Sequence, residues 1–142
     1  MRFEGRVWEQ AGSWVIELPL LAVVTQGTTK ADALEMIGDA VECLADKPGF
    51  HVDVHPGADD YFELGASDQA TLTALLLRRQ RVMHGLSLAE VARRLGAKSL
   101  NGYARYEQGR SVPSIAQLGK LLAAVSAGAD FVLSQSRDSA AV

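Results

Sequence analysis

Residues 86–109, LSLAEVARRLGAKSLNGYARYEQG, decide the fold of the C-terminal half of the chain. Ser87, followed three residues later by Glu90, forms a capping-box pattern that predicts the start of a helix. Apolar residues then recur with helical spacing as far as Leu95. Gly96 follows, and glycine ends helices well because it readily takes positive φ. These residues therefore predict one short helix and a tight turn.

A second helical pattern runs over residues 99–108 and is ended by Gly109. A helix, a short glycine turn and a second helix form the helix-turn-helix motif, whose second helix enters the major groove of DNA. A helix over residues 72–84 precedes the motif, and another opens at Pro113-Ser114. The side chains expected to face the core from these outer helices are Leu72, Leu75, Leu76, Val82, Ile115, Leu118, Leu121, Leu122 and Val125. The pattern predicts an all-α domain of four to five helices.

Side-chain directions on the second motif helix follow from a rotation of 100° per residue. With Tyr103 in the core, Tyr106 lies on the same side, and Asn101 and Arg105 point the opposite way. Asn can bind adenine and Arg guanine through paired hydrogen bonds, so this side is expected to read base edges. Glu107 falls on the inner side and is expected to accept a hydrogen bond or to pair with an arginine of helix one. The expected DNA-binding residues are Lys98, Ser99, Asn101, Gly102, Arg105, Gln108 and Arg110.

The charges are divided between the two halves of the chain. Residues 1–69 contain four basic and thirteen acidic residues, whereas residues 70–125 contain nine basic and two acidic ones. The formal net charge of −3 therefore conceals an acidic half and a basic half. Lys and Arg bind DNA by neutralising its phosphates, so the basic half is expected to bind a polyanion. Lys98 and Arg110 are placed for phosphate contacts, which position a protein without reading sequence.

The N-terminal half predicts an α+β domain, a small antiparallel sheet with one helix. Trp14, Ile16 and Leu18 alternate with neighbours on the other face, as in a half-buried strand. Ala11-Gly12 supplies the turn before this strand. The expected strands cover residues 2–9, 13–18, 23–26, 50–55 and 61–64.

One helix is expected between the third and fourth of these strands. Thr29 caps it, with Asp32 at the third helical position, and it runs to about Ala45. Its outer face carries an acidic ladder, defined here as Glu35, Asp39, Glu42 and Asp46. Such a ladder is an ordinary solvated face or a docking surface for a basic partner. The candidate docking residues are Glu35, Asp39 and Glu42.

His51, Asp53 and His55 fall on one face of the strand expected over residues 50–55. Imidazole and carboxylate groups can bind a metal ion, which leaves a metal-dependent enzyme as one hypothesis. The alternative is the solvated side of a strand whose valines pack inward. The chain has no nucleophile motif and no phosphate-binding glycine loop. We therefore expect no enzyme activity, no metal and no cofactor.

The expected division of the 142 residues is a domain over 1–66, a linker over 67–71, a second domain over 72–126 and a tail over 127–142. From Ser134 onward the composition predicts disorder. The lone Cys43 is expected to be a buried thiol. No apolar run approaches the ~20 residues of a membrane span, and no signal peptide opens the chain. A cytoplasmic protein is expected.

Two family resemblances cover nearly the whole chain. Residues 72–125 resemble the lambda-repressor/Cro-like helix-turn-helix domain, including the YEQG and PS elements after the second motif helix. Residues 1–65 resemble the HicB antitoxin fold in the runs RFEGRVWEQAGSWVIELPLL and VTQGTTKADALEMIGDAVECL. The resemblance implies a partial ribonuclease-H-like fold without nuclease activity. It also implies a type II toxin–antitoxin antitoxin that neutralises a small basic mRNA-cleaving toxin like HicA and represses its own operon.

Three hypotheses follow for the function. The first is this antitoxin, with double-stranded operator DNA and a HicA-like toxin as partners. The second is a stand-alone helix-turn-helix regulator whose N-terminal domain dimerises or senses a ligand. The third is the metal-dependent enzyme. For either regulator a homodimer is expected, because two half-sites one helical turn apart need two recognition helices.

Overall fold

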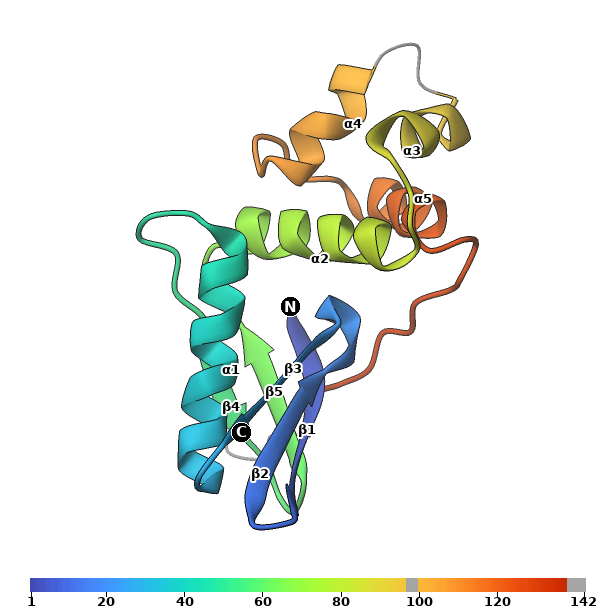
Figure 1. Cartoon of the computed structure of the whole chain (residues 1–142). Coiled ribbons are helices and arrows are strands. Elements are labelled where there is room, and N and C mark those ends of the chain that lie inside the picture. Colours follow the sequence, from blue (N-terminus) through green and yellow to red (C-terminus); the bar gives the residue numbers. More distant parts are fainter. Residues whose placement is uncertain (97–99, 138–142) are drawn as a thin grey trace. The chain divides into compact units, whose positions relative to one another are not determined.

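The computed structural model describes residues 1–96 and 100–137 (Figure 1). The chain forms two compact units. The N-terminal unit comprises residues 1–68 together with the described part of the tail from Ser134. The C-terminal unit comprises residues 69–133. The first unit is therefore built from two separate stretches of sequence.

The N-terminal unit contains a five-stranded antiparallel sheet in the order β3-β2-β1-β5-β4 (Figure 1). Its strands are β1 (Arg2–Gln10), β2 (Ser13–Leu18), β3 (Val23–Gly27), β4 (Asp53–Pro56) and β5 (Tyr61–Gly65). The sheet and the single long helix of this unit confirm the α+β expectation. The more specific ribonuclease-H-like fold stays a prediction.

The β1–β2 hairpin is made by the expected two-residue turn. Ala11 and Gly12 both have positive φ, +51° and +82°, and lie between the paired residues Gln10 and Ser13. Two positive-φ residues give the turn that matches the natural twist of a hairpin. A short 3₁₀ turn, Pro19–Leu21, then leads from β2 to β3.

Helix α1 (Lys30–Ala45) lies on one face of the sheet (Figure 1). The Thr29 hydroxyl accepts a hydrogen bond from the Asp32 backbone N–H at 3.0 Å, as the capping pattern predicts. The inner side of α1 is fully buried at Ala33, Ile37 and Val41. These side chains and the inward-facing residues of the strands form the core of the unit.

Two expectations for this unit are wrong. The fourth strand begins at Asp53 rather than at residue 50, and Phe50 instead turns into the core with an exposed fraction of 4%. Cys43 is exposed. It lies two positions after Val41, about 200° round the helix, and therefore on the side away from the sheet.

The C-terminal unit contains four helices within the described residues, in keeping with the all-α prediction. They are α2 (Gln69–Met83), α3 (Leu88–Arg94), α4 (Leu100–Glu107) and α5 (Ile115–Val125). Ser114 caps α5 by accepting a hydrogen bond from the Gln117 backbone N–H at 3.1 Å. Leu121 and Val125 on α5 are fully buried, as expected.

Two residues expected in the core of this unit are exposed. Ile115 is 89% exposed because it is the first residue of α5, and helical side chains lean toward the N-terminal end, here into solvent. Val82 is 53% exposed. The neighbouring Arg81 makes the contact with α4 instead, and Val82 lies about 100° further round α2.

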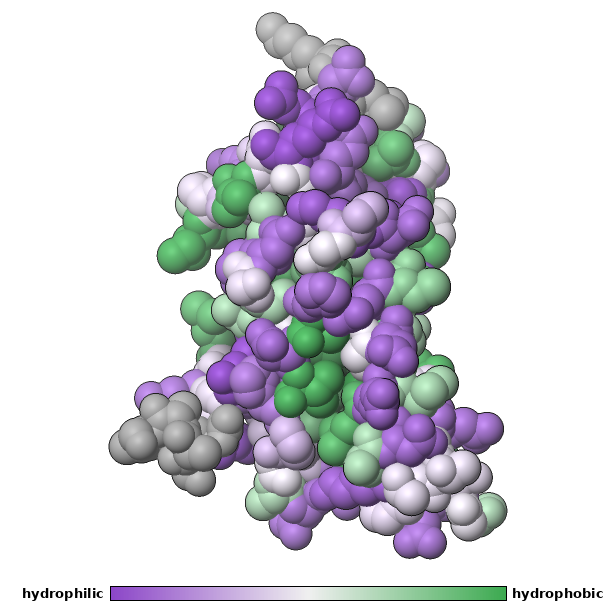
Figure 2. Space-filling view, turned by 90° about the vertical axis from the view of Figure 1, so that its left-hand side faces the viewer, coloured by the Kyte–Doolittle hydropathy of each residue, from purple (hydrophilic) through white to green (hydrophobic). Residues whose placement is uncertain are grey.

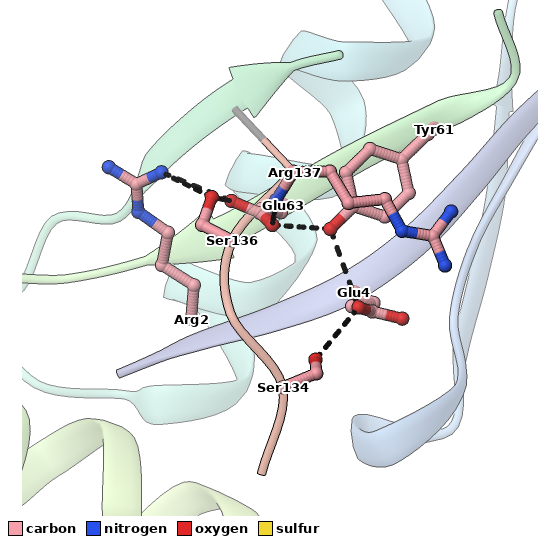
Figure 3. A network of polar contacts seen from close by, with 7 residues as sticks. All are labelled: Arg2, Glu4, Tyr61, Glu63, Ser134, Ser136 and Arg137. Atoms are coloured by element: carbon pink, nitrogen blue, oxygen red, sulfur yellow. Dashed lines mark hydrogen bonds and ion pairs between the residues drawn. The ribbon is translucent and has the colours of Figure 1, made fainter. Parts of the chain in front are cut away.

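The tail returns to the N-terminal unit, contrary to the disorder expected from Ser134 onward. Ser134 donates to the Glu4 carboxylate at 3.2 Å, Ser136 donates to Glu63, and the backbone N–H of Arg137 donates to Glu63 at 3.2 Å (Figure 3). The Arg137 guanidinium lies 4.7 Å from the centre of the Tyr61 ring. Residues 138–142 lie outside the described residues.

Glu63 is the centre of this tail contact. It is 3% exposed, and Arg2 forms an ion pair with its carboxylate at 3.1 Å. Burial opposes ionisation, but hydrogen bonds from Ser136, Tyr61 and Arg2 outweigh it and lower the pKa of Glu63 to about 2. The same burial and the hydrogen bond to Glu63 raise the pKa of Tyr61. Glu63 is therefore a carboxylate whose partners come from both ends of the chain.

Candidate nucleic-acid interface

The first motif helix, α3, has the predicted start and end. The Ser87 hydroxyl accepts a hydrogen bond from the Glu90 backbone N–H at 3.1 Å. Val91 and Ala92 are buried, and Gly96 has φ of +70°. A small residue at position 92 is suited to the contact between α3 and α4, because tightly packed helices leave no room for a longer side chain. The helix, the glycine turn and α4 together make the predicted motif.

Helix α4 has a buried side and an exposed side. Tyr103 is only 2% exposed, and Tyr106 is half-buried. Asn101 and Arg105 are exposed, as the rotation of 100° per residue predicts. The burial pattern therefore agrees with the predicted orientation of α4.

The C-terminal end of α4 is fixed to α2 by an ion pair between Arg81 and Glu107. Arg81 Nε lies 2.8 Å from Glu107 Oε2, and the exposed fractions of the two side chains are 16% and 6%. Arg81 also donates to the backbone carbonyl of Leu86 at 3.0 Å, at the start of the motif. The hydrogen bond to Glu107 raises the pKa of Arg81, and burial beside Glu107 raises the pKa of Tyr103. Glu107 thus has the predicted structural role, with Arg81 as its partner.

The remaining expected DNA-binding residues are placed as follows. Gln108 and Gly102 are exposed, and a Cβ built at Gly102 would have no atom within 4 Å. The helix surface at Gly102 is thus open to close approach by a ligand. Arg110 is exposed just beyond α4, and its backbone N–H donates to the Arg105 carbonyl at 3.0 Å. Lys98 and Ser99 lie outside the described residues.

Most of the charge available on this unit is positive. Glu107 is engaged by Arg81, and Glu90 is next to the cap of α3. Arg93 and Arg105 are exposed on the two motif helices, whereas Arg94 donates to the backbone carbonyl of Ala124 at 3.3 Å. A surface of this kind attracts phosphates at long range, and the attraction depends on salt.

The acidic ladder of the N-terminal unit divides into two kinds of residue. Glu35 and Asp39 are exposed, and neither carboxylate has a hydrogen bond or ion pair within the described part of the chain. Glu42 instead accepts a hydrogen bond from the backbone N–H of Val52 at 3.0 Å. Glu42, which is expected to dock a partner, therefore also holds α1 to the segment before β4.

The possible metal ligands do not form a site. His51 lies outside β4, and its Nδ1 is 3.6 Å from Glu42 Oε1. Asp53 and His55 lie in the strand itself. Among the residues that the structure describes, no group of three His, Cys, Asp or Glu side chains is arranged to hold a metal ion. The arrangement predicted for His51, Asp53 and His55 required a strand that extends back to residue 50.

Two features of the structure were missed by the sequence reasoning. The tail contact on Glu63 joins residues more than seventy positions apart, so no local pattern indicates it. Gly38, buried in the middle of α1, had a local signal. Glycine inside an otherwise regular amphipathic helix is unfavourable, and its presence points to a reason outside helix formation.

Comparison with known families agrees with the geometry of the C-terminal unit. Residues 77–125 match a family model described as helix-turn-helix. This match covers about a third of the chain and confirms the helix-turn-helix part of the prediction, a domain typical of DNA-binding transcriptional regulators. No curated protein matches the chain. None of the helices in the described residues has the length and hydrophobicity needed to cross a membrane.

Proposed function

We propose that this protein is an antitoxin of a type II toxin–antitoxin system. It represses its own operon with the C-terminal unit and neutralises a basic, HicA-like mRNA-cleaving toxin with the N-terminal unit. The observation that supports the first activity is the exposed side of α4, with Asn101 and Arg105 opposite the buried Tyr103. The separation of an acidic unit from a basic one supports two partners of opposite charge.

In this proposal α4 lies in the major groove of operator DNA. Asn101, Arg105 and Gln108 read base edges, and Gly102 lets the helix backbone approach them. Lys98 and Arg110 contact phosphates, and Ser99 is a further DNA-binding residue. A single unit of this size would bind weakly and with little sequence preference, so the active species is a homodimer on two half-sites.

The toxin-neutralising activity is proposed for the acidic unit. Glu35 and Asp39 are exposed carboxylates without partners inside the described chain, and Glu42 lies next to them on α1. A basic toxin would be attracted to them at long range and held by them at contact. The proposal requires that a short gene for a basic protein lies next to the gene of this chain.

Co-purification of the chain with the product of that neighbouring gene tests the proposal. We expect a stable complex, a mobility shift of the DNA upstream of the two genes and a homodimeric mass of the free chain in solution. Specific DNA binding without any co-purifying basic protein would instead support the stand-alone regulator. Failure to bind the upstream DNA, or a strictly monomeric chain at micromolar concentration, would contradict the repressor part.

A further inference from the structure

A small groove opens on the N-terminal unit between α1 and β4. Its volume is about 280 Å³, and its apolar part is formed by Leu34, Gly38, Val52, Val54 and Pro56. The exposed carboxylates of Glu35 and Asp39 form one rim. Figure 2, which views the side on which α1 lies in Figure 1, shows a strip of apolar side chains bordered by hydrophilic ones over this unit. The groove is thus apolar inside and acidic at its edge.

Gly38 gives the groove its depth. It is buried in the middle of α1, where glycine is less favourable than alanine. A Cβ built at this position would lie 3.5 Å from a methyl group of Val54 and 3.6 Å from one of Val52, which are ordinary contact distances. An alanine would therefore fit, so the packing of α1 on β4 does not require glycine. What the absent side chain provides is open space above the two valines.

The acidic rim indicates the charge of an occupant. Glu35 and Asp39 are one helical turn apart on α1, so they lie on the same side of the helix. Neither has an ion-pair partner in the described chain, whereas Glu42 is engaged by the backbone of Val52. Two carboxylates beside an apolar depression are complementary to an apolar side chain with cationic neighbours.

We propose that the groove is the docking site for a segment of a basic protein. The segment places one apolar side chain above Gly38, against Val52 and Val54, and sets Lys or Arg side chains beside Glu35 and Asp39. This inference rests on the proposed function only for the identity of the partner as a toxin. The site itself follows from the groove and its rim.

The openness of the groove favours a protein side chain over a free metabolite as its occupant. Small-molecule pockets usually hold about 300–1,000 Å³ and enclose most of their ligand. The present groove is slightly smaller and open to solvent, with Glu35 and Asp39 exposed at its edge. An apolar side chain that is carried by a protein segment and held by ion pairs at the rim can bind in such an open groove.

Titration of the isotope-labelled full chain with defined peptides tests the site by nuclear magnetic resonance. The probes are a capped heptapeptide of alternating lysine and leucine, a matched one with serine for leucine and one with glutamate for lysine. We expect the lysine–leucine peptide to shift the Gly38 amide and the methyl groups of Val52 and Val54. The serine peptide should bind about tenfold more weakly, because the apolar contact is lost. Equal binding of the two lysine peptides, or shifts away from the groove, would overturn the proposal.

Variants at the floor of the groove provide the second test. Gly38→Leu should weaken the lysine–leucine peptide about tenfold by filling the groove, and Gly38→Ala should weaken it less while keeping the fold. Gly119→Leu is the matched control, because Gly119 is an exposed helical glycine on α5 with no atom within 4 Å of a built Cβ. Peptide affinity unchanged by both Gly38 substitutions would refute the groove as the site.

Variants at the rim separate the site from general attraction between charges. The double reversal Glu35→Lys and Asp39→Lys should abolish binding. A control reversal, Glu9→Lys and Asp130→Lys, makes the same change in net charge at exposed residues outside the groove and should retain most of it. Equal losses in both would mean that only net charge matters, and the proposal would be wrong.

The same variants distinguish failure of the groove from failure of the proposed antitoxin function. If a basic toxin co-purifies with the chain and Gly38→Leu leaves its affinity unchanged, the groove inference fails and the antitoxin function stands. If no toxin exists but the peptide binds and both sets of variants respond as expected, the groove inference stands and the antitoxin function fails.

Discussion

Arg81 on α2 donates to both carboxylate oxygens of Glu107 on α4, with distances of 2.8 to 3.1 Å. A bidentate guanidinium–carboxylate contact fixes the relative direction of the two side chains as well as the distance between them. Because Glu107 is the last residue of α4, the contact sets the orientation of the helix whose other side carries Asn101 and Arg105. The Arg81–Glu107 pair is therefore a positioning element of the candidate DNA interface.

Arg81→Met should destabilise the C-terminal unit by about 2 kcal/mol, because Glu107 would be left largely buried without its partner. Chemical denaturation of the full chain, followed by circular dichroism, measures this change. Arg93→Met is the control, since Arg93 is exposed on α3 and should change stability by less than about 0.5 kcal/mol. Similar losses in the two variants would show that the pair has no special role.

Arg105→Ala should relax the sequence preference of DNA binding more than it weakens binding overall. Loss of a paired contact to a base removes about 1–3 kcal/mol of discrimination at one position. Selection of binding sites from a randomised DNA library, compared between the variant and the wild type, measures the preference. An unchanged preference would show that Arg105 does not face the bases.

Lys98→Ala should act differently from Arg105→Ala. A phosphate contact carries no sequence information, so affinity for all DNA sequences should fall by a similar factor. The slope of log affinity against log salt concentration should decrease by about one unit. Titrations at several salt concentrations measure the slope, and a loss confined to one sequence would contradict the assignment.

Gly38→Ala should stabilise the N-terminal unit by about 0.5–1 kcal/mol. Alanine is the better helix former, and the added methyl group meets Val52 and Val54 at contact distance. Gly27→Ala is the contrasting variant. Its Cβ would lie 2.4 Å from the backbone nitrogen of Ala33, so the end of β3 would have to move and stability should fall. Thermal unfolding of the two variants gives opposite shifts if this explanation is right.

The tail contact should weaken in acid. The pKa of Glu63 is about 2 in the folded chain and 4.5 ordinarily, so the folded state favours the ionised form. The stabilisation is thus fully present above about pH 4.5 and is lost as the pH falls toward 2. The amide signals of Ser136 and Arg137 should report this loss in a pH titration. Glu63→Gln should remove the dependence over this range, and an unchanged titration in that variant would assign it to another group.

Much of the fold follows from patterns within short segments. Ser87 with Glu90 and Thr29 with Asp32 predict helix starts that the structure contains, because capping involves residues only three apart. The alternation of Ile16 and Leu18 with Val15 and Glu17 on the other face likewise predicts β2. Local hydrogen bonding and burial on one face are both readable from sequence.

Sequence patterns fail to predict the structure where contacts between distant segments determine it. Ser136 and Arg137 read as part of a polar, structureless end, yet their partners are residues of β1 and β5. The start of β4 at Asp53 was equally hidden, because Glu42 holds the preceding residue Val52 through its backbone. The exposure of Ile115 was missed because helical periodicity alone does not show which residue is the first of the helix.

The contact of Ser136 with Arg2 means that the first and last described segments meet on one face of one sheet (Figure 3). The contact also makes the helices of the C-terminal unit an insert, along the sequence, between two pieces of the N-terminal unit.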